Sequence, residues 1–138
     1  MEIKVKGVAI TERGWAGHFC CANKCTFHRN TLLVKGNLRI VVSSVGRMIE
    51  NGPNRMELQT IGCDRYYETM VWFANSTKWQ DADVSRGMIE CYSPSSFADP
   101  WDEMPANKLH DKIVEKYVNK MANNEINENY EEHYEKED

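Results

Sequence analysis

The amino-acid sequence predicts an α+β fold, in which a twisted antiparallel sheet of about five to seven strands is covered on one face by a single C-terminal amphipathic helix. The first two thirds of the chain consist of short segments rich in β-branched and aliphatic residues, separated by turn residues. Near the C-terminus the apolar spacing changes to one residue in every four, which is typical of a helix. A length of 138 residues with 41% hydrophobic residues is enough for one domain with a buried core.

The predicted strands follow one another between short turns. Residues 1–10 alternate apolar and polar side chains, and Gly7 permits a bulge or bend among them. The clearest hairpin joins residues 31–34 to residues 38–44 through Lys35-Gly36-Asn37, and its second strand should be central in the sheet. The Asn-Gly and Pro residues at positions 50–54 predict a turn before the strand MELQTIG, and the bulky segment RYYETMVWFAN predicts another strand.

The predicted helix runs from about Pro105 to Asn123. Pro105 suits the first turn of a helix, and Asn123-Asn124 mark its end. Its apolar stripe consists of residues spaced by four with two further valines: Leu109, Ile113, Tyr117, Met121, Val114 and Val118. This stripe is expected to pack on the sheet.

Charge is distributed unevenly along the chain. Residues 125–138 contain seven acidic residues and one lysine, whereas the whole chain has a net charge of −4, so residues 1–124 are slightly basic. We therefore expect a single domain over residues 1–124 and an acidic tail over residues 125–138 that is solvated or disordered. The alternative is a tail that docks on a basic partner or imitates nucleic acid.

Nothing in the sequence indicates a membrane segment. No run approaches the ~18 apolar residues of a membrane span, and the opening MEIKVKG lacks the apolar core of a signal peptide. We expect a soluble, cytoplasmic protein with no membrane partner. Its five cysteines are expected to be thiols there, because cytosol is reducing.

The segment GWAGHFCCANKCTFHRN is the closest approach to a chemical motif. Four residues of zinc-ligand type follow the spacing His-x2-Cys-x3-Cys-x2-His, namely His18, Cys21, Cys25 and His28. The long loop that usually separates the two ligand pairs is missing, so the favoured interpretation is no cofactor. In that interpretation Phe19, Cys21 and Phe27 point into the core from strand ends, the segment ANKC forms the intervening turn, and Lys24 and His28 face solvent. A cysteine nucleophile formed by Cys25 and a histidine is a further alternative.

Two other groups of residues could carry chemistry. Asp81 and Asp83 are two residues apart, so on a strand they would share one face and could hold Mg²⁺ together with Glu68. Aromatic and basic side chains could form a binding surface for a protein or for single-stranded nucleic acid, and the candidate anchors are Arg13, Trp15, Arg29 and Arg39.

Several blocks together resemble a family of small proteins carried by phages and other mobile elements of gut bacteria. The blocks are TERGWAGHFCCANKCTFHRNTLL, RIVVSSVG, IGCDRYYETMVWFA, WQDADVSR and ANKLHDKIVEKY, and they span roughly residues 8–120. The resemblance implies an anti-CRISPR protein that inhibits a type II CRISPR effector nuclease by binding it, without catalysis, in the cytoplasm of a bacterial host cell. It assigns no catalytic residue and does not extend to the acidic tail.

Three functional hypotheses therefore come from the sequence. The leading one is a non-enzymatic inhibitor of a host defence complex. The alternatives are a zinc-stabilised nucleic-acid-binding module and a small metal-dependent hydrolase or nuclease built on Asp81 and Asp83. The sequence does not define the oligomeric state.

Overall fold

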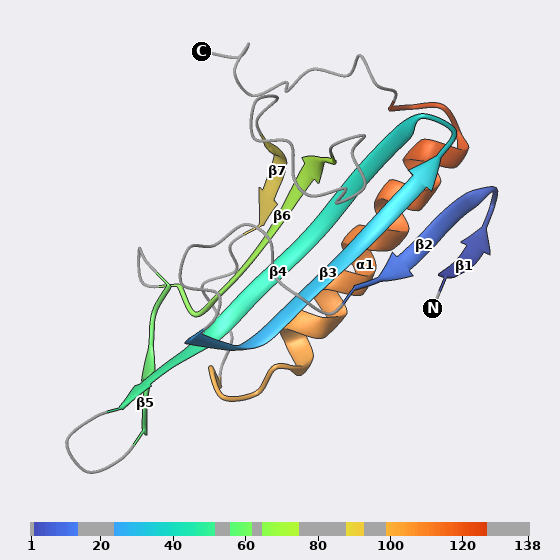
Figure 1. The fold of residues 1–138 in the computed structure, drawn as a ribbon. Coiled ribbons are helices and arrows are strands. Elements are labelled where there is room, and N and C mark those ends of the chain that lie inside the picture. Colours follow the sequence, from blue (N-terminus) through green and yellow to red (C-terminus); the bar gives the residue numbers. More distant parts are fainter. Residues whose placement is uncertain are drawn as a thin grey trace, which may run out of the picture.

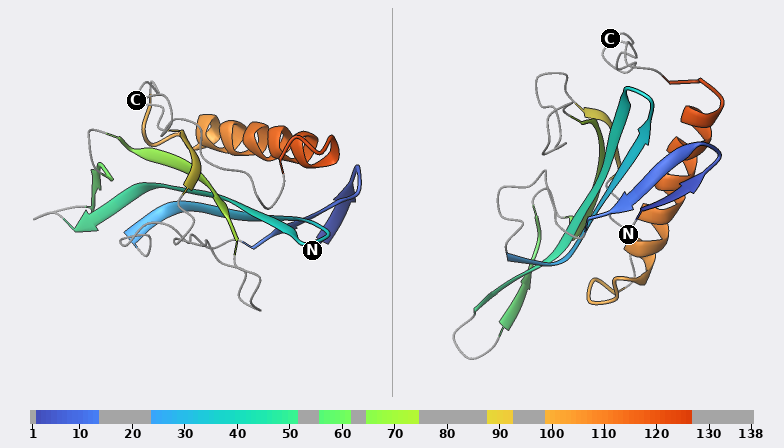
Figure 2. Two further views of the ribbon diagram at one scale, coloured as in Figure 1. Left: turned by 90° about the horizontal axis from the view of Figure 1, so that it is seen from above. Right: turned by 45° about the vertical axis from the view of Figure 1, so that its right-hand side comes forward.

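A computed structural model describes residues 2–13, 24–51, 56–61, 65–74, 88–92 and 99–126. The described part of the chain forms an antiparallel sheet of seven strands and one C-terminal helix, α1 (Met104–Ala122), which covers one face of the sheet (Figures 1 and 2). The predicted α+β fold is therefore confirmed. No helix among these residues has the length and hydropathy that a membrane span requires.

The sheet begins with a hairpin at its edge. β1 (Glu2–Val5) and β2 (Val8–Glu12) pair through a two-residue turn, Lys6-Gly7, in which both φ angles are positive, at 54° and 82°. Such values are those of a type I′ turn, which suits the twist of a hairpin and favours glycine. Where the sequence suggested a bulge or bend at Gly7, the chain thus reverses direction completely.

The longest strands form the centre of the sheet. β3 (Cys25–Lys35) and β4 (Leu38–Asn51) form the predicted hairpin, closed by Gly36-Asn37, and β2 pairs with the other edge of β3. The second edge of β4 is shared, because β6 (Tyr67–Phe73) pairs with its first half and β5 (Met56–Gln59) with its end. The prediction that the strand after the turn is central is confirmed.

β7 (Met88–Tyr92) pairs with β6 and forms the edge opposite β1, giving the order β1-β2-β3-β4-β6-β7. This strand was not predicted from the sequence. Gly46 of β4 lies close against β6 and the residue before it, because a Cβ built on it would overlap the Tyr67 ring and lie 2.7 Å from the carbonyl oxygen of Tyr66. Glycine is required there by this close approach.

The main core lies between α1 and the sheet. The helix contributes Ile113, Tyr117, Val118 and Met121, all buried, while Leu109 and Val114 pack at the margin, as the apolar stripe predicted. From the sheet, aliphatic and aromatic side chains complete the cluster: Val8, Leu33, Leu38, Ile40, Val42, Val71, Phe73 and Ile89. Burial of such side chains is the main contribution to the stability of the fold.

The C-terminal end of α1 is capped, and the chain after the cap returns to the core. Asn124 has a φ of 56°, its N–H donates to Met121 O, and the N–H of Glu125 donates to Lys120 O, which is the Schellman arrangement with asparagine at the left-handed position. Lys35 Nζ donates to the Met121 carbonyl at 2.9 Å and so ties this end to β3. Directly after the cap, Ile126 is buried in the main core. Residues 127–138, the rest of the predicted acidic tail, lie outside the described residues.

Candidate binding surfaces

A buried polar network lies between α1 and the sheet. His110 is 0% exposed, and both of its ring nitrogens contact hydroxyl groups: Nδ1 lies 2.6 Å from Ser44 Oγ on β4, and Nε2 lies 2.8 Å from Thr31 Oγ1 on β3. Ser44 Oγ is also 2.6 Å from Thr69 Oγ1 on β6. Three neighbouring strands are thereby connected to one helical side chain.

The direction of each hydrogen bond in this network follows from the contact between Thr31 and Glu12. Thr31 donates to the Glu12 carboxylate at 2.9 Å, so its oxygen is left to accept from Nε2–H of His110. Nδ1 must then accept from Ser44, which in turn accepts from Thr69. Every member has a partner while His110 is neutral.

Electrostatics maintain this protonation pattern. Burial, assisted by the positive charge of Arg29, lowers the pKa of His110 from 6.5 to about 4. Burial alone would raise the pKa of Glu12, but hydrogen bonds from Arg29 and Thr31 outweigh it and hold that pKa below its usual value. Glu12 is therefore an acceptor, and His110 is neutral at neutral pH.

Serine, histidine and an acid are also the residue types of a hydrolase site, but Ser44 and His110 are 1% and 0% exposed. A substrate would have to reach the serine oxygen, and that oxygen is enclosed between the helix and the sheet. We therefore assign the network to holding α1 on the sheet. The apolar stripe predicted the buried face of the helix but gave no sign of a histidine within it.

A second polar cluster fixes the other side of α1. Tyr117 and Tyr92 donate hydroxyl hydrogens to the carboxylate of Glu90 on β7, and Lys116 Nζ lies 3.0 Å from the same carboxylate. Burial acts to raise the pKa of Glu90, but these hydrogen bonds outweigh it and lower the pKa. Glu90 and Tyr92 belong to β7, and Lys116 and Tyr117 belong to α1, so this cluster too connects the helix to an edge strand.

The structure separates the predicted arginine anchors. Arg29 faces α1, where it bonds Glu12 at 2.9 Å and Asp111 at 2.8 Å. Arg13 lies on the opposite face of the sheet, where its Nε donates to the buried Asn30 at 2.6 Å. Arg39 shares that opposite face, but it pairs with Val34, four residues along β3 from Asn30 and so roughly 13 Å away. Trp15 lies outside the described residues.

The residues predicted as metal ligands are described only in part. Cys25 is buried against Val45 and Ile61, and His28 is exposed, while His18 and Cys21 lie outside the described residues. Within the described ranges no three histidine, cysteine or acidic residues are grouped as metal ligands. The zinc site stays a prediction.

Of the three residues of the predicted Mg²⁺ site, the structure describes only Glu68. Glu68 is buried, and its carboxylate forms an ion pair with Arg65 at 2.6 Å. Asp81 and Asp83 lie outside the described residues, so the metal-dependent hydrolase stays a prediction as well.

Large apolar side chains are exposed at two places in the described part of the chain. Trp101 and Met104, at the start of α1, are 49% and 55% exposed. Ile3 and Val5, on β1, are 52% and 39% exposed. Exposed aromatic and aliphatic residues that gather in one place commonly mark an interaction surface.

The backbone that carries Trp101 is held firmly. Arg47 donates to the Trp101 carbonyl at 3.0 Å and forms an ion pair with Glu103 at 3.0 Å. Tyr67 donates to the carbonyl of Pro100 at 2.6 Å, and the N–H of Trp101 donates to Asp99 Oδ1 at 2.9 Å. We call Trp101 and Met104 the tryptophan surface. In the sequence Trp101 lies between Pro100 and Pro105, and nothing there indicates that its ring is exposed.

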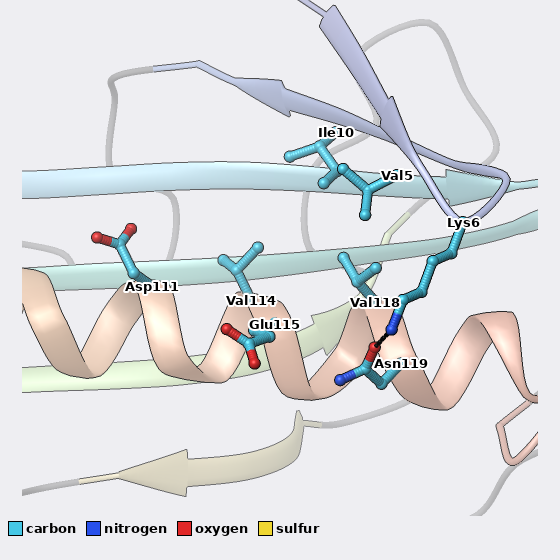
Figure 3. Close-up of a pocket in the computed structure, with 8 residues that line it drawn as sticks. All are labelled: Val5, Lys6, Ile10, Asp111, Val114, Glu115, Val118 and Asn119. Atoms are coloured by element: carbon cyan, nitrogen blue, oxygen red, sulfur yellow. Dashed lines mark hydrogen bonds between the residues drawn. The ribbon is translucent and has the colours of Figure 1, made fainter.

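Beside β1, a groove of about 350 Å³ separates the first hairpin from α1 (Figure 3). Val5 and Ile10 line it from the hairpin, and Val114 and Val118 from the helix. Lys6 closes one end by donating to Asn119 Oδ1 at 2.7 Å. An apolar surface therefore lies next to β1.

Comparisons with known proteins gave no relative: no family model, no curated protein and no solved structure matches this chain.

Proposed function

We propose that the protein acts by binding another protein, as an inhibitor of a host defence complex of the type II CRISPR effector class. The resemblance of its sequence blocks to small phage-carried proteins suggests the class of partner. The observation that carries the binding role is the exposed Trp101, whose backbone is fixed by Arg47, Tyr67 and Asp99.

A fixed and exposed tryptophan is well suited to anchor an interface. Tryptophan is among the residues enriched in interface hot spots, where a few side chains contribute most of the binding energy. Ordering an exposed side chain on binding costs conformational entropy, and a backbone that is already held in place reduces that cost. Met104, three residues later in the chain, adds an exposed and adaptable apolar side chain.

The charges around Trp101 indicate the chemistry of the partner surface. Asp99, Asp102 and Glu103 are close to it in sequence. The first two are exposed, and Glu103 forms an ion pair with Arg47. Carboxylates around an aromatic anchor favour a basic surface with an accessible apolar pocket. A type II effector nuclease holds its guide–target duplex in a positively charged channel, which has this character. Occupation of that channel would exclude nucleic acid.

A protection experiment tests the proposal. Phage or plasmid is introduced into a bacterial host that carries a type II effector nuclease, with and without the protein. We expect the wild-type protein to protect the invading DNA, and the double variant Trp101→Ala, Met104→Ala to lose protection while its thermal stability is unchanged. The control variant Lys112→Ala, at an exposed helix position, should protect like the wild type.

The two ways in which this proposal can fail are distinguishable. A wild-type protein that gives no protection contradicts the inhibitor function itself. Full protection by the double variant contradicts only the tryptophan surface as the contact.

A further inference from the structure

The outer edge of β1 is a part of the molecule that the proposed inhibitor function does not use. Among the described strands β1 pairs only with β2, so one of its edges is open. All four residues of β1 are exposed, including the apolar Ile3 and Val5. An open edge strand with apolar side chains is a template for pairing with another strand.

The turn of the hairpin determines which backbone groups face outward. With a two-residue turn, Val5 and Val8 form the hydrogen-bonded pair that closes the hairpin. Hydrogen-bonded and non-hydrogen-bonded pairs alternate along antiparallel strands, so Ile3 also bonds inward to β2. The N–H and C=O groups of Glu2 and Lys4 therefore point away from the sheet.

Charge selects one register for an added strand. Because Glu2 and Lys4 present the outward groups, a second copy of β1 can pair antiparallel in a symmetric manner about Glu2, Ile3 or Lys4. A centre at Glu2 places two glutamates opposite each other, and a centre at Lys4 places two lysines opposite each other. A centre at Ile3 instead places Glu2 opposite Lys4 of the other copy, twice by symmetry.

The Ile3-centred register also matches the apolar residues. In that register Ile3 lies directly opposite Ile3 of the other copy, on the face of the sheet that α1 covers, where close pairs of branched side chains stabilise a sheet. The charged pairs lie on the opposite face, since side chains alternate along a strand. Lysine on an edge strand usually discourages pairing, but here each lysine would meet a glutamate.

We propose that β1 pairs with β1 of a second copy of this chain, Ile3 opposite Ile3 and Glu2 opposite Lys4, to form a symmetric homodimer with a continuous sheet. The tryptophan surface lies outside this interface. The groove beside β1 contacts α1 from Asp111 to Asn119, whereas Met104 begins the helix, roughly 10 Å along its axis from Asp111. Dimer formation and partner binding can therefore be tested separately.

A charge-swap experiment with the full chain tests the register. The dimer dissociation constant is measured by sedimentation at concentrations up to about 1 mM, which detects even an interface of small area. We expect a reversible wild-type dimer, and a dissociation constant at least about tenfold higher for Glu2→Lys or Lys4→Glu, since like charges then face each other twice. The double variant Glu2→Lys, Lys4→Glu should restore the wild-type value, and Lys112→Glu is the control with no effect.

A second measurement identifies the strand edge itself. The Lys4 amide points outward, so its hydrogen exchange should slow as the dimer forms with rising concentration. A wild-type chain that stays monomeric, single variants with unchanged dissociation constants, a double variant that fails to recover, or a Lys4 amide that exchanges equally fast in the dimer would each overturn the proposal.

Discussion

Ser44 Oγ lies 2.6 Å from Nδ1 of His110, although the two residues are 66 positions apart in the chain. The contact joins the central strand to the only helix of the described residues, and it requires a neutral imidazole that accepts from the serine hydroxyl. Because His110 is fully buried, a proton added to it would remove this acceptor in a place that water does not reach.

The buried histidine makes stability depend on pH. The pKa of His110 falls from 6.5 to about 4 on folding, so the unfolded chain binds a proton more readily between these values. Its contribution to the free energy of unfolding is complete above pH 6.5 and is lost as the pH falls toward 4. We expect a loss of about 2 kcal/mol between pH 7 and pH 5, measured by urea unfolding.

Two variants test the source of that pH dependence. His110→Gln should be less stable at pH 7 but should lose little further stability between pH 7 and pH 5. His28→Gln, at an exposed position, should retain the wild-type loss because His110 is unchanged. Glu12 does not contribute to this pH dependence. Because its pKa is lowered from 4.5, the stability that it contributes is lost below pH 4.5. An unchanged loss in His110→Gln would contradict the assignment.

The helix stripe gives a second prediction. Ile113 is buried in the main core, and Lys112 beside it is exposed. Truncation of a buried isoleucine to alanine removes contacts and leaves a cavity, so Ile113→Ala should lower the free energy of unfolding by about 2 to 5 kcal/mol. Lys112→Ala should change it by less than about 0.5 kcal/mol. Equal effects in chemical denaturation would show that α1 does not pack as described.

The residue after the helix cap gives a third prediction. Ile126 is buried in the main core, beyond the domain end that the change in composition suggested. Ile126→Ala should therefore destabilise the protein by about 2 kcal/mol or more, whereas Glu125→Ala, at an exposed position, should have little effect. Thermal unfolding of the two variants compares them directly. If Ile126→Ala unfolds at the wild-type temperature, the core does not extend past the cap.

Elements that depend on local sequence were predictable. The Lys35-Gly36-Asn37 segment combines turn residues with β-branched flanks, and the stripe from Leu109 to Met121 has a helical period, so both elements were recognised. The helix bounds were nearly correct, whereas the hairpin strands predicted over residues 31–34 and 38–44 extend over residues 25–35 and 38–51. Lys6-Gly7 was harder, because one glycine among alternating residues is compatible with a bulge as well as with a hairpin. β7 is short and gave no comparable alternation.

The candidate sites depend on contacts that sequence does not contain. His110 meets Thr31 and Ser44 across 79 and 66 positions, and nothing near it in the chain indicates a buried polar partner. Trp101 would be expected in a core from its type alone, and only the fold shows that it is exposed. Arg29 was predicted as a binding anchor, and in the structure its side chain contacts Glu12 and Asp111.

The most direct test of the account is the affinity of the purified protein for a type II effector nuclease, measured by calorimetry with and without guide RNA and target DNA. We predict that the wild-type protein binds the nuclease and that guide RNA and target DNA in the channel weaken this binding. The double variant Trp101→Ala, Met104→Ala should bind with an affinity about 30-fold lower, which corresponds to about 2 kcal/mol, as expected for hot-spot residues. Lys112→Ala should bind like the wild type. No binding by the wild-type protein, or equal binding by the double variant, would contradict an inhibitor that acts through the tryptophan surface.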